Sequence, residues 1–325
     1  MFQITPYPEW SWSHSRDHLF QECPRRYYYH YYGSHNGWLR DAAPEQQETY
    51  RLKQMANLFL VFGDALHQAA DMHIRQFQAK NHLFSYSELF TKIRNMMNQA
   101  VLESKDIEQW QAAPKKRKML VEQYYYHQLP KRIVQIIKER METCLTNLLD
   151  SESMREITTD PRVEILEMEK LNTIYVRGEK VYVKLDVLYR IGDRYIISDW
   201  KTGQEDESIE EQLYLYAYYL HREAGVPLSQ IEIRTEYLLT GECRKTYVTE
   251  ANLEQVEEKI VSSTAEMKSY LHDPAQNQPL SRLDFEGAAN PRSCMYCNYR
   301  QLCELKDRTL LDAADEAAPG AEQAG

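Results

Sequence analysis

The sequence predicts an α/β protein in which a central mixed sheet is flanked by helices. Helix-like periodicity dominates up to about Asp150, strand-like segments follow it, and a further helical segment separates the later strands. Because strands and helices alternate in the second half, we expect helices to pack on the sheet. The expected strands lie at residues 162–170, 180–203 and 231–239 and near Tyr247, and the expected later helices at residues 208–225 and 250–271.

The bulk composition is that of an ordinary globular protein. The 325 residues are 43% hydrophobic and 27% charged, enough for one large domain with insertions or for two domains. The net charge of −10 argues against indiscriminate polyanion binding, so a nucleic-acid partner would need local basic patches or metal ions. We find no early apolar targeting segment and no run of about 18 apolar residues, and therefore expect a cytoplasmic protein without a membrane partner.

The N-terminal segment is expected to be helical from about Ser13, with Pro24 in the first turn of a second helix. Five tyrosines follow in this second helix and just beyond it, at positions 27, 28, 29, 31 and 32. Their rings could stack on unpaired bases, but packing against neighbouring helices is the favoured interpretation.

A second segment of interest is locally basic. It carries Lys-Lys-Arg-Lys at 115–118, together with Lys131, Arg132, Lys138 and Arg140. These cations could follow a phosphate backbone. A solvated helix face explains the same charges at least equally well.

A hairpin is predicted across residues 180–203, where two β-rich runs flank the dipeptide Gly-Asp at 192–193. Glycine at the first of two central positions is typical of a two-residue hairpin turn. With that turn, Asp186 lies directly opposite Asp199. Side chains alternate along a strand, so Asp186, Asp199 and Lys201 then share one face of the sheet. A slip of one residue would move Asp186 to the other face.

Two converging carboxylates form a partial shell for Mg²⁺ or Mn²⁺, and a metal ion removes the repulsion between them. Such an ion polarises a phosphoryl oxygen and lowers the pKa of bound water. Lys201 would point the same way, where it could orient that water or stabilise charge on the phosphate. The alternative is an Asp–Lys pair on an exposed strand, because Asp-Xaa-Lys is a short and common pattern.

Asp186 followed by Asp-Trp-Lys-Thr-Gly at 199–203 resembles the core of the PD-(D/E)XK nuclease superfamily, in its RecB-like branch. The segment Gly-Asp-Ala-Leu-His, ending at His67, is similar to the Gly-xxx-His segment of that branch, and Gln212 and Tyr216 match its QxxxY motif. The resemblance implies a restriction-endonuclease-like core. It further implies that His67, Asp186, Asp199 and the main-chain carbonyl of Trp200 are metal ligands, that Asp186, Asp199 and Lys201 are catalytic, and that Gln212 and Tyr216 line the site or contact DNA.

Four of the six cysteines form a candidate metal site. Cys294, Cys297 and Cys303 lie in one short segment, and Cys23, far upstream, is the natural fourth ligand. Four thiolates suit a 4Fe–4S cluster or a tetrahedral Zn²⁺, and spacing alone does not choose between them. The remaining two, Cys144 and Cys243, lie outside the pattern and are expected to be buried thiols.

The arrangement of one early cysteine before a proline and three late ones resembles the iron–sulfur nucleases, which include AddB-type recombination nucleases and CRISPR-associated RecB-like nucleases. This resemblance implies a structural 4Fe–4S cluster that joins the first helices to the last loop. We expect N-terminal helices at residues 1–33, a helical region with His67 and an insertion at 34–160, the nuclease core at 161–272, a cysteine-rich segment at 273–311 and a disordered tail at 312–325.

The expected function is therefore that of a Mg²⁺- or Mn²⁺-dependent deoxyribonuclease. The resemblance implies an exonuclease acting on single-stranded or end-containing DNA, in DNA repair. The alternative is a catalytically weak or inactive iron–sulfur DNA-binding subunit within a recombination, repair or CRISPR-associated complex.

Overall fold

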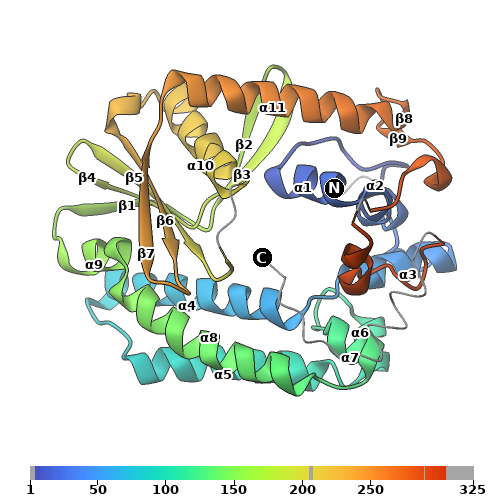
Figure 1. Ribbon diagram of the computed structural model, residues 1–325, viewed down its shortest axis with the longest axis horizontal. Helices are drawn as coiled ribbons and strands as arrows, with labels where there is room; N and C mark the ends of the chain where they lie inside the picture. The colour runs from blue at the N-terminus through green and yellow to red at the C-terminus, as the bar shows by residue number, and fades with distance from the viewer. Residues whose placement is uncertain (1–3, 205–207, 289, 305–325) are drawn as a thin grey trace. The chain divides into compact units, whose positions relative to one another are not determined.

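The computed structural model describes residues 4–204, 208–288 and 290–304 (Figure 1). The expected tail at 312–325 and the end of the expected cysteine-rich segment lie outside these ranges. The chain divides into two compact units. Of the described residues, the first comprises 4–58, 99–133, 261–288 and 290–304, and the second comprises 59–98, 134–204 and 208–260. Among the described helices, none is long and apolar enough to cross a membrane.

The α-helices are α1 (His14–Glu22), α2 (Pro24–Tyr28), α3 (Pro44–Lys53), α4 (Leu58–Lys80), α5 (Tyr86–Glu103), α6 (Ile107–Ala112), α7 (Val121–Tyr126), α8 (Lys131–Asp150), α9 (Glu152–Thr159), α10 (Ser208–Tyr218) and α11 (Glu250–Ser269). The strands are β1 (Val163–Met168), β2 (Leu171–Val176), β3 (Glu179–Lys184), β4 (Val187–Ile191), β5 (Arg194–Lys201), β6 (Ile231–Tyr237), β7 (Glu242–Tyr247), β8 (Leu271–Asp273) and β9 (Gln278–Pro279).

The second unit is built on a five-stranded mixed sheet of order β1-β4-β5-β6-β7. Only the β5–β6 pair is parallel, and helix α10 connects these two strands and packs on both of them (Figure 1). A parallel pair requires such a crossover connection, whereas the antiparallel pairs need only short turns. The mixed sheet flanked by helices confirms the α/β prediction.

The predicted turn at 192–193 and its register are confirmed, since Ile191 pairs with Arg194 and Val187 with Ser198. Gly192 has φ +61°, the left-handed conformation that glycine adopts without strain. The first arm of the hairpin is shorter than expected, because the run from Lys180 breaks between β3 and β4. Strand β3 instead pairs with β2 in a separate two-stranded sheet, and Asp186 lies in the break between β3 and β4.

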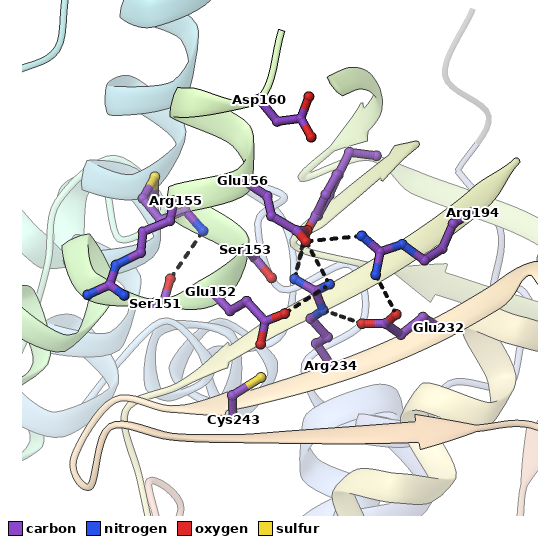
Figure 2. Close-up of polar contacts among 12 residues, drawn as sticks. Ser151, Glu152, Ser153, Arg155, Glu156, Asp160, Arg194, Glu232, Arg234 and Cys243 are labelled. Carbon is purple, nitrogen blue, oxygen red and sulfur yellow. Dashed lines mark hydrogen bonds and ion pairs between the residues drawn. The ribbon is translucent and has the colours of Figure 1, made fainter. Parts of the chain in front are cut away.

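One face of the five-stranded sheet carries a buried ion network (Figure 2). Arg234, on β6, is fully buried and donates to Glu156 of α9 at 2.8 Å and to Glu232 of its own strand at 2.5 Å. Arg194, on β5, pairs with both carboxylates at 3.0 and 3.1 Å. Tyr189 adds its hydroxyl, which donates to Glu156 at 2.7 Å. These contacts fix α9 against the strands, because each buried charge has a partner.

The first unit has an aromatic core. Tyr29 stacks on Tyr299 at 5.3 Å and lies in one apolar cluster with Trp110. Both N-terminal predictions are confirmed: Ser13 caps α1 through its side chain, and Pro24 opens α2. The tyrosine run mainly packs, as favoured, since three of its five residues are buried: Tyr27, Tyr29 and Tyr32.

Candidate active site and cysteine cavity

His67 enters the site from α4, a helix whose other face is buried in the second unit. One turn earlier, Gly63 allows a close approach: a Cβ there would lie 3.3 Å from Oγ1 of Thr202, just beyond β5. The spacing of Gly63 and His67 puts both on the same side of the helix. The glycine of the Gly-xxx-His segment therefore has a physical role: because it has no side chain, α4 can lie close to the end of β5, the strand that carries Asp199.

Glu169 and Asp186 meet because of a bulge in β1. The pairing of β1 with β4 shifts by one residue between Ile165 and Glu167, so that Met168, rather than Glu167, pairs with Val187. The next residue, Glu169, then donates its amide N–H to the carbonyl of Asp186 at 3.0 Å. Bulges are frequent beside active sites, where they redirect a side chain. Glu169 also has φ +51°, an uncommon conformation for a residue other than glycine.

The imidazole of His67 contacts both acids. Its Nδ1 lies 3.2 Å from Oδ1 of Asp186 and 3.7 Å from Oε1 of Glu169. The second oxygen of Asp186 accepts from the amide of Trp200 at 2.8 Å, and Lys184 pairs with Glu169. His67, Glu169 and Asp186 offer ligand atoms within 4.8 Å of one another, a group that could hold a metal ion.

Asp199 and Lys201 lie two residues apart on β5, and Nζ of Lys201 is 2.7 Å from Oδ2 of Asp199. Asp199 is 3% exposed, and this oxygen receives no hydrogen bond of good geometry from the described residues. The indole of Trp200, between them, bonds to Glu236 at 2.9 Å. Glu236 shares its strand and its i, i+2 spacing with Arg234, so Trp200 lies on the ion-network face and Asp199 and Lys201 on the opposite one.

The charges of the site act strongly on one another. Burial and the neighbouring Asp186 raise the pKa of Asp199, although Lys201 opposes the shift. Burial also disfavours the charged form of Asp186, but protonated His67 holds the pKa of Asp186 below its usual value. Burial lowers the pKa of Lys201, and Asp199 more than reverses the effect, so Lys201 remains an ammonium. A bound cation would relieve the repulsion between these acids, which His67 and Lys201 now offset in part.

Gln212 and Tyr216 connect Lys201 to the strand break. Nζ of Lys201 lies 3.4 Å from Oε1 of Gln212, whose amide donates to the Tyr216 hydroxyl at 2.6 Å. That hydroxyl donates in turn to the carbonyl of Lys184, two residues before Asp186. Tyr216 is 1% exposed, so its contacts are internal to the protein. The pair therefore links the lysine of β5 to the backbone that presents Asp186.

The residues fit a hard divalent cation. Carboxylate oxygens with one imidazole are a donor set that Mn²⁺ accepts, and Mg²⁺ accepts the oxygens. The buried Oδ2 of Asp199 has the Lys201 ammonium at 2.7 Å but no hydrogen bond of good geometry from the described residues, so it can also accept a metal ion. Asp186, Glu169, Asp199 and His67 are the side chains that would hold it.

A protein-family model for the PD-(D/E)XK nuclease superfamily matches residues 11–304. The chain belongs to the PD-(D/E)XK nuclease superfamily. No curated protein matches it. Among solved structures, the chain is similar to one described as "Crystal structure of SSO0001", with 18% identity over 54% of this chain and 82% of that chain and a TM-score of 0.26.

In this superfamily member, the sequence alone does not distinguish Glu169 from Glu164 and Glu167, which lie just before it in β1. The register of β1 against β4 selects it, and the bulge that sets this register leaves no clear trace in the sequence. Alternation from a regular strand would have aligned Met168 with Asp186 instead.

The four cysteines of this PD-(D/E)XK protein line one small cavity in the first unit. Cys23 ends α1 and caps α2, where its sulfur accepts from the amide of Arg26 at 3.3 Å. The late loop is held beside this helix, since the hydroxyl of Tyr29 donates to the carbonyl of Leu302 at 2.8 Å and Arg25 donates to the carbonyl of Phe285 at 3.0 Å. The first helices and the last loop are thus neighbours in the folded chain.

Burial raises the pKa of Cys297 to about 12 and also raises the pKa of Cys23. Buried thiols of this kind are neutral unless a metal stabilises the thiolate. Of the two thiols outside the pattern, Cys144 is buried as expected, whereas Cys243 is only partly buried. That second expectation is wrong because Cys243 lies on β7, the edge strand of the sheet.

Proposed function

We propose that the protein is a metal-dependent deoxyribonuclease that hydrolyses phosphodiester bonds, as an exonuclease on single-stranded or end-containing DNA. One observation carries the proposal: His67, Glu169 and Asp186 offer ligand atoms within 4.8 Å of one another, and Asp199 and Lys201 are coupled to them electrostatically. We assign the catalytic core to residues 161–272, with His67 supplied by the preceding helical region at 34–160.

The chemistry would divide between a bound Mg²⁺ or Mn²⁺ and the side chains around it. The ion, held by His67, Glu169, Asp186, Asp199 and the carbonyl of Trp200, would polarise the scissile phosphate and lower the pKa of bound water. Lys201 is an ammonium, which suits it to hold the attacking water or to stabilise negative charge on the phosphate, and not to act as the base.

Gln212 and Tyr216 would act as positioning residues. Gln212 restrains the ammonium of Lys201, and Tyr216 restrains the strand end that leads to Asp186. Holding reacting groups within a fraction of an ångström of their productive geometry is worth large factors in rate. Gln212 is partly exposed, so it also remains available to line the DNA path.

We further propose that Cys23, Cys294, Cys297 and Cys303 hold a structural 4Fe–4S cluster, as in the AddB-type branch. The order of the cysteines supports a cluster over zinc, since one early cysteine before a proline and three late ones resemble the pattern of the iron–sulfur nucleases. The four side chains line one cavity, so they are near enough to share one metal group. The cluster would reinforce the contact between the first helices and the last loop.

Cleavage of 5′- and 3′-labelled single- and double-stranded DNA with Mn²⁺ tests the nuclease proposal. We expect cleavage from ends by the wild type and none by Asp199→Ala or Lys201→Ala. Equal activity in all three proteins would reject the enzyme and favour the alternative, a DNA-binding subunit of a repair or CRISPR-associated complex.

The cluster has its own test. Anaerobically purified protein should absorb at about 400 nm and contain iron, and Cys297→Ser should lose both the absorbance and the iron. A colourless protein that contains zinc would reject the iron–sulfur assignment.

A further inference from the structure

An open groove in the first unit has a composition that the proposed active site does not use. It has a volume of about 540 Å³ and is lined by the loop at 37–40, one face of α3 and the turn at 111–116. Gln47, Tyr50 and Arg51 line it from α3, at positions i, i+3 and i+4, which share one side of a helix.

The charge of the groove is opposite to that of the chain. Four cations line it, Arg40, Arg51, Lys115 and Lys116, and among its described lining residues none is acidic. Arg51 is paired with Glu48 at 3.4 Å, whereas Arg40, Lys115 and Lys116 make no ion pair with any residue that the structure describes. The whole chain has a net charge of −10, so this local basic surface is not a consequence of composition.

Aromatic rings line the same groove as these cations. Trp38 is 42% exposed, an uncommon state for so large an apolar ring, and its ring meets that of Tyr50 edge-on at 5.8 Å. An edge-on pair holds the tryptophan in place and leaves the faces of the two rings in different planes. Cations and aromatic rings in one groove are the combination that single-stranded nucleic acids need, because bases stack on rings and phosphates pair with cations.

We infer that this groove, defined by Trp38, Tyr50, Arg40, Lys115 and Lys116, binds unpaired single-stranded DNA, with a base on Trp38 and phosphates along the cations. The choice of DNA rests on the proposed nuclease function, but the binding itself does not. A duplex keeps its bases stacked and offers the tryptophan no partner. An acidic peptide would satisfy the cations but not the rings.

The test measures binding of full-length protein to fluorescein-labelled oligodeoxythymidylate of about 15 nucleotides, by anisotropy without divalent metal. Lys115→Glu with Lys116→Glu should weaken binding at least about tenfold and reduce the salt slope by about 1.4, at about 0.7 per lost contact. The matched control is Lys131→Glu with Arg132→Glu, which makes the same charge change at two exposed residues outside the groove. It should change affinity less than about twofold.

The aromatic part has a separate readout. Trp38→Ala should weaken binding by about five- to a hundredfold, and Trp38→Phe should retain most of it. DNA should also quench tryptophan fluorescence in the wild type more than in Trp38→Phe, which keeps the other four tryptophans. The inference fails if both charge reversals weaken binding equally, or if Trp38→Ala binds single-stranded DNA with wild-type affinity. It also fails if the groove variants lose duplex binding as much as single-strand binding, or if poly-glutamate displaces the labelled strand as well as single-stranded DNA does.

Failure of this inference and of the nuclease proposal can be told apart. Hydrolysis of the small phosphodiester bis-(p-nitrophenyl) phosphate needs the proposed active site but no strand, and the groove variants should retain it, which also shows that they fold. If the wild type hydrolyses no phosphodiester and the groove variants selectively lose DNA binding, the groove inference stands and the nuclease proposal fails. If the wild type hydrolyses the small substrate but does not bind single-stranded DNA, the nuclease proposal stands and the groove inference fails.

Discussion

The two faces of the sheet in the second unit both bury charges, yet they do so in opposite ways. On the face covered by α9, Arg234 and Arg194 are matched by Glu156 and Glu232 in a set of mutual hydrogen bonds (Figure 2). On the other face, acids gather around His67, and the pKa of the most buried acid, Asp199, is raised. A closed set of ion pairs holds a helix in place. An electrostatically strained set of acids is what a cation-binding site requires.

The largest expected effect is on the acid face. Asp199→Asn removes a buried charge with almost no change in shape, and we expect DNA cleavage to fall by a factor on the order of 10³ or more. Its thermal stability should change little, because the burial penalty of the carboxylate and its repulsion with Asp186 disappear together with the ion pair to Lys201. Asp193→Asn, an exposed residue of the same hairpin, is the control and should cleave normally. A destabilised Asp199→Asn would show that this carboxylate is structural.

Arg234→Met should have the opposite outcome. It leaves the buried Glu232 and the partly buried Glu156 without their main partner, and the free energy of unfolding should fall by about 3–5 kcal/mol in urea titrations. Arg155→Met, in the same helix α9 but outside the network, breaks a largely exposed pair with Asp150 and should cost less than about 1 kcal/mol. If both substitutions cost the same, the ion network is not what holds α9.

Tyr216→Phe should reduce cleavage by about 10- to 100-fold with a smaller loss of stability, because it removes the hydroxyl that restrains the strand before Asp186. Tyr219→Phe removes a comparable hydrogen bond, to Glu167 at 3.0 Å, and is the matched control. Cleavage kinetics under single-turnover conditions compare them. Equal rates in both variants would remove Tyr216 from the proposed machinery.

The ion network also predicts a dependence on pH. Burial alone would raise the pKa of Glu156, but hydrogen bonds from Arg234 and Tyr189 hold it below its usual 4.5. A carboxylate with a lowered pKa stabilises the fold above its unfolded pKa, and this stability is lost as the pH falls. As the pH is lowered from 7, the free energy of unfolding should therefore fall less steeply in Glu156→Gln than in the wild type. An unchanged slope would contradict the assignment.

The smallest effect concerns the approach of α4 to β5. Gly63→Ala gains helix propensity but adds a Cβ at 3.3 Å from Thr202, so we expect unchanged stability and a loss of activity below about tenfold. Thr202→Ala in the same protein should restore activity. Failure to restore it would mean that Gly63 acts in another way.

Local rules predicted the hairpin register, because a two-residue turn and strand alternation together determine which residues face each other. They did not predict the break before Asp186 or the β1 bulge, since both depend on pairing with distant strands. The ion network was equally hidden. Glu232, Arg234 and Glu236 alternate on β6 as a solvated face would, and only the covering helix α9 makes that face interior.

The central claim is that the acid face holds a divalent cation, and direct titration of Mn²⁺, followed by its electron paramagnetic resonance signal, tests it. The wild type should show one tight site. Asp186→Asn and Glu169→Gln should weaken it by about 10- to 100-fold or more, and Glu156→Gln, on the other face, should leave it unchanged. Equal Mn²⁺ affinity in all four proteins would contradict the account.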